Sequence, residues 1–170
     1  MQTFLPYPTH DFAEVASVLD NQRLNKQALE GWQIMMTLLE LDPAGNHRQP
    51  KGWVNHPAVK MWRGYESALL NYIVEMVVEW KRRGYKSTIA DKAMATFDRA
   101  TELGLVWENG YSELPHWMHE PVYDELAKSH RTALLVKNYE WYSQFGWAEG
   151  LDVRPTEYDY IWITDKEENK

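Results

Sequence analysis

Apolar side chains recur at the 3.6-residue spacing of an α-helix over most of this chain, and this pattern constrains its fold more than any other feature. The clearest stretch is residues 57–84, whose apolar stripe consists of Met61, Trp62, Leu69, Tyr72, Ile73, Met76, Val77 and Trp80. Pro57 suits the first position of this helix, and Gly84 suits its end. Because the alternating patterns typical of strands are sparse, the sequence predicts an all-α fold.

Other helices are expected from capping signals and from the same periodicity. Asp11 and Glu14 have the spacing of a capping box, and the helix that they begin is expected to reach about Leu41. It stops at the turn formed by residues 42–45, and a polar loop then extends to about Asn55. The remaining predicted helices cover residues 88–103 and 121–137, and residues 138–144 could continue the second.

The length of 170 residues fits one domain with a core of ordinary size, of which residues 163–170 are expected to be a frayed tail. The aromatic stretch 158–162 is expected to pack along the surface. The chain has no cysteine, which excludes disulfides, Cys-zinc sites and cysteine nucleophiles. No apolar run approaches the roughly 18 residues of a membrane span. Since no signal-peptide pattern is present either, we expect a cytoplasmic protein with no membrane partner.

Charge is distributed unevenly along the chain. The 18 Lys and Arg residues against 25 Asp and Glu residues give a net charge of −7, which argues against nucleic acid as a partner. Residues 20–86 nevertheless carry a net charge of +3, whereas residues 87–170 carry −8. The densest basic cluster, Lys81 to Lys86, is interpreted as a solvated helix end. DNA therefore stays open as a partner for the middle of the chain.

One face of the first predicted helix changes from apolar to charged. The face consists of Phe12, Val15, Ala16 and Leu19, followed by Arg23, Lys26 and Glu30. Surface ion pairs are the ordinary explanation for such a row, but here the row extends a stripe expected to be buried. A carboxylate beside two cations and aromatic surface can serve as an acid–base group in the cleavage of a glycosidic bond. Glu30 is therefore the candidate catalytic residue, although the sequence pairs no second carboxylate with it.

Histidines give weaker candidates. His116 and His119 lie three residues apart in a loop, and no histidine has the spacing of a convincing metal site, so we predict no metal and no cofactor. His56 opens the second predicted helix, where capping is its expected role. His130 is expected to be an ordinary core or surface histidine. Most aromatic residues belong to the core, although some could stack on extruded bases.

Several short motifs occur in the order and at the spacing of a known family. They are Gln22-Arg23-Leu24 with Glu30, then Asn55-His56-Pro57-Ala58-Val59, Glu79-Trp80-Lys81-Arg82-Arg83-Gly84-Tyr85, and Ser129-His130-Arg131 with Leu134-Leu135. Together they resemble the pyrimidine-dimer DNA glycosylase (endonuclease V) family. The likeness extends from Met1 to about Trp147, and it is greatest to a bacterial and phage branch whose members open with Met-Gln-Thr-Phe.

The resemblance implies a compact all-α domain that uses no metal and acts as a DNA glycosylase with AP-lyase activity. In that mechanism the N-terminal α-amine attacks C1′ of the sugar and forms a Schiff base, while a glutamate on the first helix assists. Here the amine would be that of Met1, which we expect to be retained because Gln2 is large, and the glutamate would be Glu30. An α-amine with a pKa of about 8 keeps a useful unprotonated fraction at neutral pH.

The resemblance also implies contacts to damaged or modified DNA, or to a small nucleotide. The expected binding residues are Gln2, Arg23, Lys26, Asn55, His56, Arg63, His130 and Arg131. Two arginines of the family pattern are replaced here, by Gln2 and Leu29. The alternative is therefore a divergent protein of the same fold that binds a small nucleotide without cleaving it, and a third possibility is a purely structural partner protein. The sequence leaves the base or lesion and the oligomeric state open.

Overall fold

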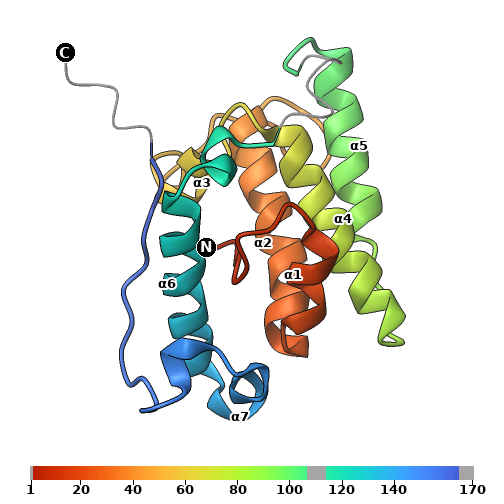
Figure 1. Ribbon diagram of the computed structural model, residues 1–170. Coiled ribbons are helices and arrows are strands. Elements are labelled where there is room, and N and C mark those ends of the chain that lie inside the picture. The colour runs from red at the N-terminus through yellow and green to blue at the C-terminus, as the bar shows by residue number, and fades with distance from the viewer. Residues whose placement is uncertain (1, 107–113, 165–170) are drawn as a thin grey trace, which may run out of the picture.

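A computed structural model describes residues 2–106 and 114–164, and in these ranges the protein is helical (Figure 1). The helices are α1 (Phe12–Val18), α2 (Asn21–Leu39), α3 (Pro57–Met61), α4 (Glu66–Arg82), α5 (Ile89–Glu102), α6 (Val122–Lys137) and α7 (Tyr139–Tyr142). Short 3₁₀ helices in the same ranges are η2 (His116–His119), η3 (Ser143–Phe145) and η4 (Ala148–Gly150). Within them, β pairing is limited to one isolated bridge between Leu41 and His47. The all-α prediction is confirmed.

The prediction of one continuous first helix is wrong, because the chain breaks between α1 and α2. Leu19 is extended, and the side chain of Asp20 caps α2 by accepting a hydrogen bond from the N–H of Arg23 at 2.8 Å. An Asp at this position satisfies one of the unpaired N–H groups of the first helical turn. The charged row from Arg23 to Glu30 therefore begins a new helix and does not extend the buried stripe of α1.

The second predicted helix is interrupted as well. α3 ends at Met61, and Gly64 adopts φ +82° in the turn that precedes α4. This left-handed backbone conformation costs glycine little, which is why the chain turns there. The ring of His56 caps α3, since its Nδ1 accepts from the N–H of Ala58 at 3.1 Å. The capping role predicted for His56 is confirmed.

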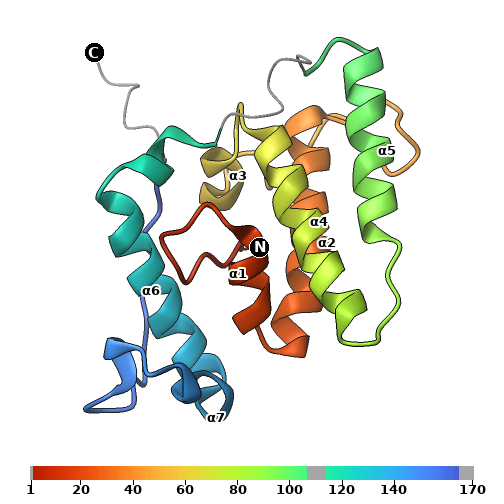
Figure 2. The same ribbon diagram turned by 45° about the vertical axis from the view of Figure 1, so that its right-hand side comes forward.

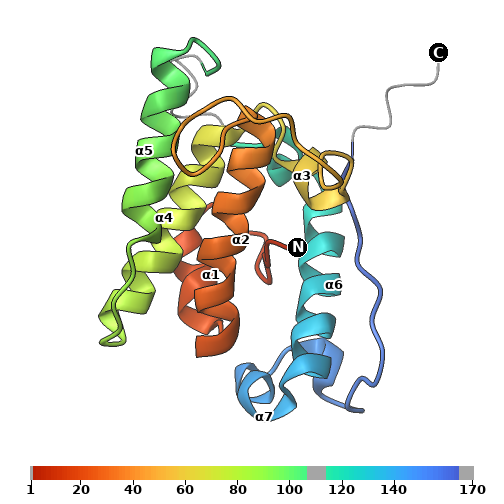
Figure 3. The same ribbon diagram turned by 180° about the vertical axis from the view of Figure 1, so that it is seen from behind.

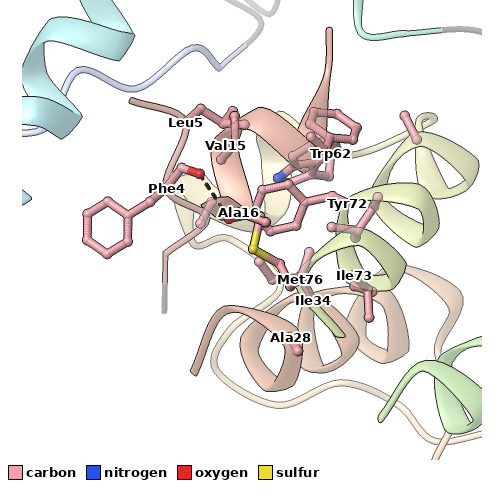
Figure 4. Close-up of a cluster of buried hydrophobic side chains, with 14 of the residues drawn as sticks. Phe4, Leu5, Val15, Ala16, Ala28, Ile34, Trp62, Tyr72, Ile73 and Met76 are labelled. Carbon is pink, nitrogen blue, oxygen red and sulfur yellow. Dashed lines mark hydrogen bonds between the residues drawn. The ribbon is translucent and has the colours of Figure 1, made fainter. Parts of the chain in front are cut away.

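The core lies between α2, α4 and α5, and α1 packs on α4 (Figures 1 and 2). Figure 4 shows Ala28 and Ile34 of α2 beside Ile73 and Met76 of α4, and all four side chains are buried. Gly31 allows the two helices to approach closely, because a Cβ added there would lie 2.7 Å from Cγ1 of Ile73. The close contact fixes which face of α2 is buried and which remains for a site.

The N-terminal segment, residues 2–11, runs between α2 and α6 (Figures 2 and 3). On the side of the helical bundle, the N–H of Phe4 donates to Oε1 of Gln27 at 2.7 Å. The Tyr72 hydroxyl donates to the carbonyl of Phe4 at 2.9 Å (Figure 4). The indole N–H of Trp62 donates to the hydroxyl of Thr3 at 2.9 Å. These buried bonds hold an extended segment in the interior, where its backbone groups would otherwise be unsatisfied.

The same segment joins the bundle to α6. The N–H of Leu5 donates to Nδ1 of His130 at 2.9 Å, and the guanidinium of Arg131 donates to the carbonyl of Pro6 at 2.9 Å. Arg131 also forms a two-pronged ion pair with Glu149, with N–O distances of 2.7 and 2.9 Å. α6 is thus attached to the rest of the protein through the start of the chain.

The stretch after η4 follows an extended path along α6 (Figures 1 and 3). Tyr158, Tyr160 and Trp162 are half-buried, whereas Asp159 and Ile161 between them are exposed. The predicted packing of this aromatic stretch along the surface is confirmed. Of the predicted frayed tail, residues 165–170 lie outside the described residues. None of the helices in the described ranges has both the length and the apolar run of a membrane span.

Candidate functional site

The carboxylate of Glu30, in the middle of α2, meets the start of the chain. The N–H of Gln2 donates to Oε2 of Glu30 at 3.0 Å. Lys26, one helical turn earlier, places its Nζ 3.6 Å from Oε1 of Glu30. The Glu30 side chain is 12% exposed and that of Lys26 is 66% exposed, so the cation shields the carboxylate from the solvent side. The structure therefore brings Gln2, Lys26 and Glu30 together.

Two cavities share Glu30 as a wall. The N-terminal cavity, of about 300 Å³, is bounded by α2 from Gln22 to Glu30, by Gln2 and Phe4, and by Lys137, Tyr158 and Tyr160. The loop cavity, of about 440 Å³, is bounded by Glu30, Gln33 and Met36 on α2 and by Arg48, Lys51 and Trp53 in the loop before α3. Glu30 therefore faces two neighbouring hollows along one side of α2.

Cations border both cavities. Arg23 and Lys137 stand at the N-terminal cavity, and Arg48 and Lys51 at the loop cavity. Arg23 is held by Asp20, with 2.9 Å between its guanidinium and the carboxylate. Although the whole chain carries a net charge of −7, positive side chains are concentrated around Glu30. Such a local group of cations is what a phosphate backbone requires.

Aromatic rings form a row beside the carboxylate. The ring of His56 lies 5.1 Å from Trp53 and 5.6 Å from Trp162, and Trp162 lies 5.4 Å from Tyr160. Burial lowers the pKa of His56, and the charge of Glu30 opposes this shift. Trp53 is 48% exposed at the rim of the loop cavity. Exposed ring faces of this kind can stack on bases.

His130 is a core histidine, as expected, but it touches the site. Its ring is fully buried, and its Nε2 faces the side-chain carboxamide of Gln2. Burial lowers the pKa of His130 to about 3. The ring is therefore neutral at physiological pH. The Gln2 residue thus links a buried histidine of α6 to the carboxylate of α2.

Other predicted site residues lie away from both cavities. Asn55 is exposed in the loop before α3, and Arg63 donates to the carbonyl of Val54 at 3.4 Å. Arg131 is engaged by Glu149. Burial raises the pKa of that carboxyl, but the hydrogen bonds and charge of Arg131, together with a backbone hydrogen bond and the charge of Lys128, outweigh burial and leave the pKa lowered. The DNA-binding roles of these residues stay predictions. Met1 lies outside the described residues, so its predicted role also stays a prediction.

The basic cluster at the end of α4 is only partly a solvated helix end. Arg82 is exposed, but Arg83 is largely buried and pairs with Glu79 at 2.7 Å. Its guanidinium also donates to the carbonyls of Ser17 and Leu19, at 3.0 and 2.7 Å. Arg83 therefore satisfies the free carbonyl groups at the end of α1.

The described parts of the chain contain no group of three His, Asp or Glu side chains that could hold a metal.

Sequence reasoning missed three residues of the site. Gln27 is buried, and its side chain accepts a hydrogen bond from the N–H of Phe4. Its position on the same helical face as Glu30 is a signal that could have placed it in the charged row. Tyr72 was assigned to the apolar stripe, but its hydroxyl holds the N-terminal segment. Tyr160 lines the N-terminal cavity from the C-terminal stretch, and no spacing in the sequence connects it to α2.

The fold and the site define a class: a small all-α protein whose chain start meets a carboxylate inside a cavity bordered by cations. This chain belongs to the pyrimidine dimer DNA glycosylase family, whose family model matches residues 1–93. The matched part includes the N-terminal segment, α1 to α4 and Glu30, whereas α6 and the aromatic C-terminal stretch lie beyond it. The comparisons with curated proteins and with solved structures return no match. The family identifies the protein as a DNA glycosylase of DNA repair, with DNA as its substrate.

Proposed function

We propose that this protein removes damaged pyrimidines from DNA through its N-terminal α-amine, which Glu30 assists. The hydrogen bond from the N–H of Gln2 to Oε2 of Glu30 carries the proposal, because it sets the start of the chain against the carboxylate in a cavity. Covalent bond lengths keep the α-nitrogen of Met1 within about 4 Å of the nitrogen of Gln2. A sugar in the N-terminal cavity would then be within reach of both groups.

The reaction is a displacement at C1′ of the sugar. The lone pair of the amine forms a bond to C1′ while the C1′–N1 bond breaks, and the electron pair of that bond leaves with the pyrimidine. The amine loses a proton and the base gains one, and the Glu30 carboxylate is the group placed to carry it. The sugar ring then opens at the C1′–O4′ bond, the oxygen takes up a proton, and a C1′=N iminium joins the DNA to the protein.

That iminium also explains the proposed lyase activity. It acidifies the C2′ proton, whose loss expels the 3′-phosphate and cleaves the strand. The DNA is held by Arg23 and Lys26 at the N-terminal cavity and by Arg48 and Lys51 at the loop cavity. Extruding a nucleotide at the lesion costs a few kcal/mol, which the aromatic row beside Glu30 can offset by stacking.

Borohydride trapping with dimer-containing and abasic DNA tests the proposal. The wild type should give a covalent adduct with both substrates. Glu30→Gln keeps an oxygen that accepts from Gln2 but removes the base, so the rate of adduct formation should fall about 100-fold or more. The matched control is Glu40→Gln, a change of the same type at the exposed end of α2, which should leave the rate unchanged.

Two results would contradict the mechanism: a wild type that forms no adduct, or Glu30→Gln that forms one at the wild-type rate. Calorimetry with nucleotides and duplex DNA distinguishes the proposed glycosylase from the alternative, a protein of the same fold that binds a small nucleotide. Binding of a mononucleotide without binding of duplex DNA would favour a protein that holds a small nucleotide and leaves it intact.

A further inference from the structure

The hydrogen bonds of His130 determine how the side chain of Gln2 is oriented. Because Nδ1 of His130 accepts from the N–H of Leu5 at 2.9 Å, Nδ1 carries no proton. The buried ring is neutral, so its single proton is on Nε2, and Nε2 faces the Gln2 carboxamide. A Gln2 nitrogen at that position would set two donors against each other. The carboxamide therefore turns its oxygen toward Nε2 and accepts.

This orientation leaves the amino group of Gln2 free. The end of the carboxamide that points away from His130 is buried and has no hydrogen-bond partner among the described residues. With the oxygen on His130, that end is the NH₂ group, which offers two donors. Gln2 is only 7% exposed, and it lines the N-terminal cavity with Glu30. A buried donor without an acceptor is unfavourable, so an acceptor on a ligand is its natural partner.

We propose that the side-chain NH₂ of Gln2 binds the O2 carbonyl of the target pyrimidine and stabilises that base as its bond to C1′ breaks. This inference rests on the proposed function, because the proposed mechanism places C1′ of the sugar beside Glu30. The same residue supplies the backbone N–H on Glu30 and the amide in the cavity, so the two donors are separated by no more than the length of one side chain. O2 is the acceptor of a pyrimidine that lies next to its bond with C1′.

Such a contact strengthens during the reaction. As the C1′–N1 bond breaks, its electron pair passes to N1 and spreads to O2, and a donor already aimed at O2 stabilises this charge. The N–H of Leu5 donates to His130, and His130 donates to Gln2, so both bonds polarise the amide in the same direction. Gln2 is thus a catalytic residue that touches the base, and His130 is a positioning residue behind it.

Two variants remove the donor while keeping the size of the side chain. Gln2→Met has no polar group, and Gln2→Glu still accepts from His130. Both keep a large second residue, so Met1 is processed in the same way. The single-turnover rate of glycosidic-bond cleavage in dimer-containing DNA should fall about 100-fold, the loss typical of one transition-state donor. Borohydride trapping on abasic DNA should stay within twofold of the wild type, because no base leaves there.

Gln144→Met is the matched control, since Gln144 is exposed in η3 and lines neither cavity; it should leave both rates unchanged. If the Gln2 variants lose equal rate on dimer and abasic DNA, Gln2 only holds the start of the chain. If they lose no rate on either substrate, Gln2 does not recognise the base. Each result overturns the inference. A wild type that fails to trap abasic DNA overturns the proposed function instead.

A measurement on the wild type keeps the test independent of how the variants fold. Sulfur in place of O2 in the target pyrimidine is a weak acceptor but makes the base a better leaving group. If Gln2 binds O2, base release should slow at least tenfold despite the better leaving group. Release that stays as fast or becomes faster overturns the inference.

Discussion

At the scale of single residues, the site depends on groups that each serve two purposes. Glu30 accepts from the N–H of Gln2 and also faces both cavities. Gln2 contacts Glu30 through its backbone and His130 through its side chain. Because the structural and chemical contacts come from different atoms, conservative substitutions separate them. Glu30→Gln keeps the acceptor for the N–H of Gln2 but removes the base, and Gln2→Glu keeps the acceptor for His130 but removes the NH₂ donor.

His130 makes the stability of the protein depend on pH. Its pKa is about 3 in the folded protein and near 6.5 as a reference, so the unfolded chain binds more protons between these values. The free energy of unfolding should therefore fall as the pH drops below 6.5, by about 1.4 kcal/mol for each pH unit. Urea unfolding at pH 7 and pH 5 measures this.

The variant that isolates the effect is His130→Gln, which does not titrate. It should be less stable than the wild type at pH 7, because Leu5 and Gln2 lose their partner, and it should lose less stability on going to pH 5. The same loss in both proteins would show that other groups set the acid sensitivity.

At the scale of elements, the break between α1 and α2 decides where the charged row points. Distant parts of the chain hold the capping residue Asp20 in place. The N–H of Asp20 donates to the hydroxyl of Tyr142, and the Asp20 carboxylate accepts from the side chain of Asn138 at 3.1 Å. The Asp20 side chain also accepts from the guanidinium of Arg23 at 2.9 Å. The end of α6 and α7 therefore fix the first turn of α2, on which Arg23 lies.

Removing this cap should cost both stability and activity. Asp20→Ala loses the hydrogen bond to the N–H of Arg23 and leaves buried partners unpaired, so we expect the free energy of unfolding to fall by about 2 kcal/mol. Base release should slow as well, because Arg23 loses its support. Asp11→Ala is the control: Asp11 caps α1 in the same way at an exposed position, so it should cost about 1 kcal/mol with no change in base release. If the two variants behave alike, the cap of α2 has no special role.

The elements show what the sequence can and cannot predict. Periodicity and capping residues located α5 and α6 closely, because these helices have clear ends and an apolar face. They missed the break at Asp20, because the helical spacing of the row continues across it and the distant groups that stabilise the break, Tyr142 and Asn138, are more than a hundred residues away. Glu30 was found from its charged neighbours and from the family resemblance. Gln27 was not, because it carries no charge and was left out of the charged row although its spacing places it there. Tyr160 was not, because only the folded chain brings it beside Glu30.

At the scale of the whole molecule, the site is assembled from both sides of the N-terminal segment. The part that matches the family supplies Glu30 and the cations of α2, whereas α6 and the C-terminal stretch supply His130, Lys137 and Tyr160. The segment between them is attached to α2 through Gln27 and to α6 through His130. Movement of α6 relative to α2 would therefore change the N-terminal cavity directly.

The charge distribution of the molecule predicts how it binds DNA. We expect the four cations Arg23, Lys26, Arg48 and Lys51 at the two cavities to make the phosphate contacts, so the plot of log affinity against log salt should have a slope of about −4 or shallower. Replacing both Arg48 and Lys51 by Gln should reduce that slope by about 2, since each phosphate contact contributes about 0.9.

The matched control is the double replacement of Lys86 and Lys92, two exposed cations at the N-terminal end of α5, a helix that lies across the bundle from the N-terminal segment (Figure 1). It removes the same charge from the molecule but no contact to a phosphate. An unchanged slope for the control and a shallower one for Arg48→Gln with Lys51→Gln would place DNA over the loop cavity. Equal changes in both would mean that only the net charge matters, because long-range attraction does not depend on which cation is removed.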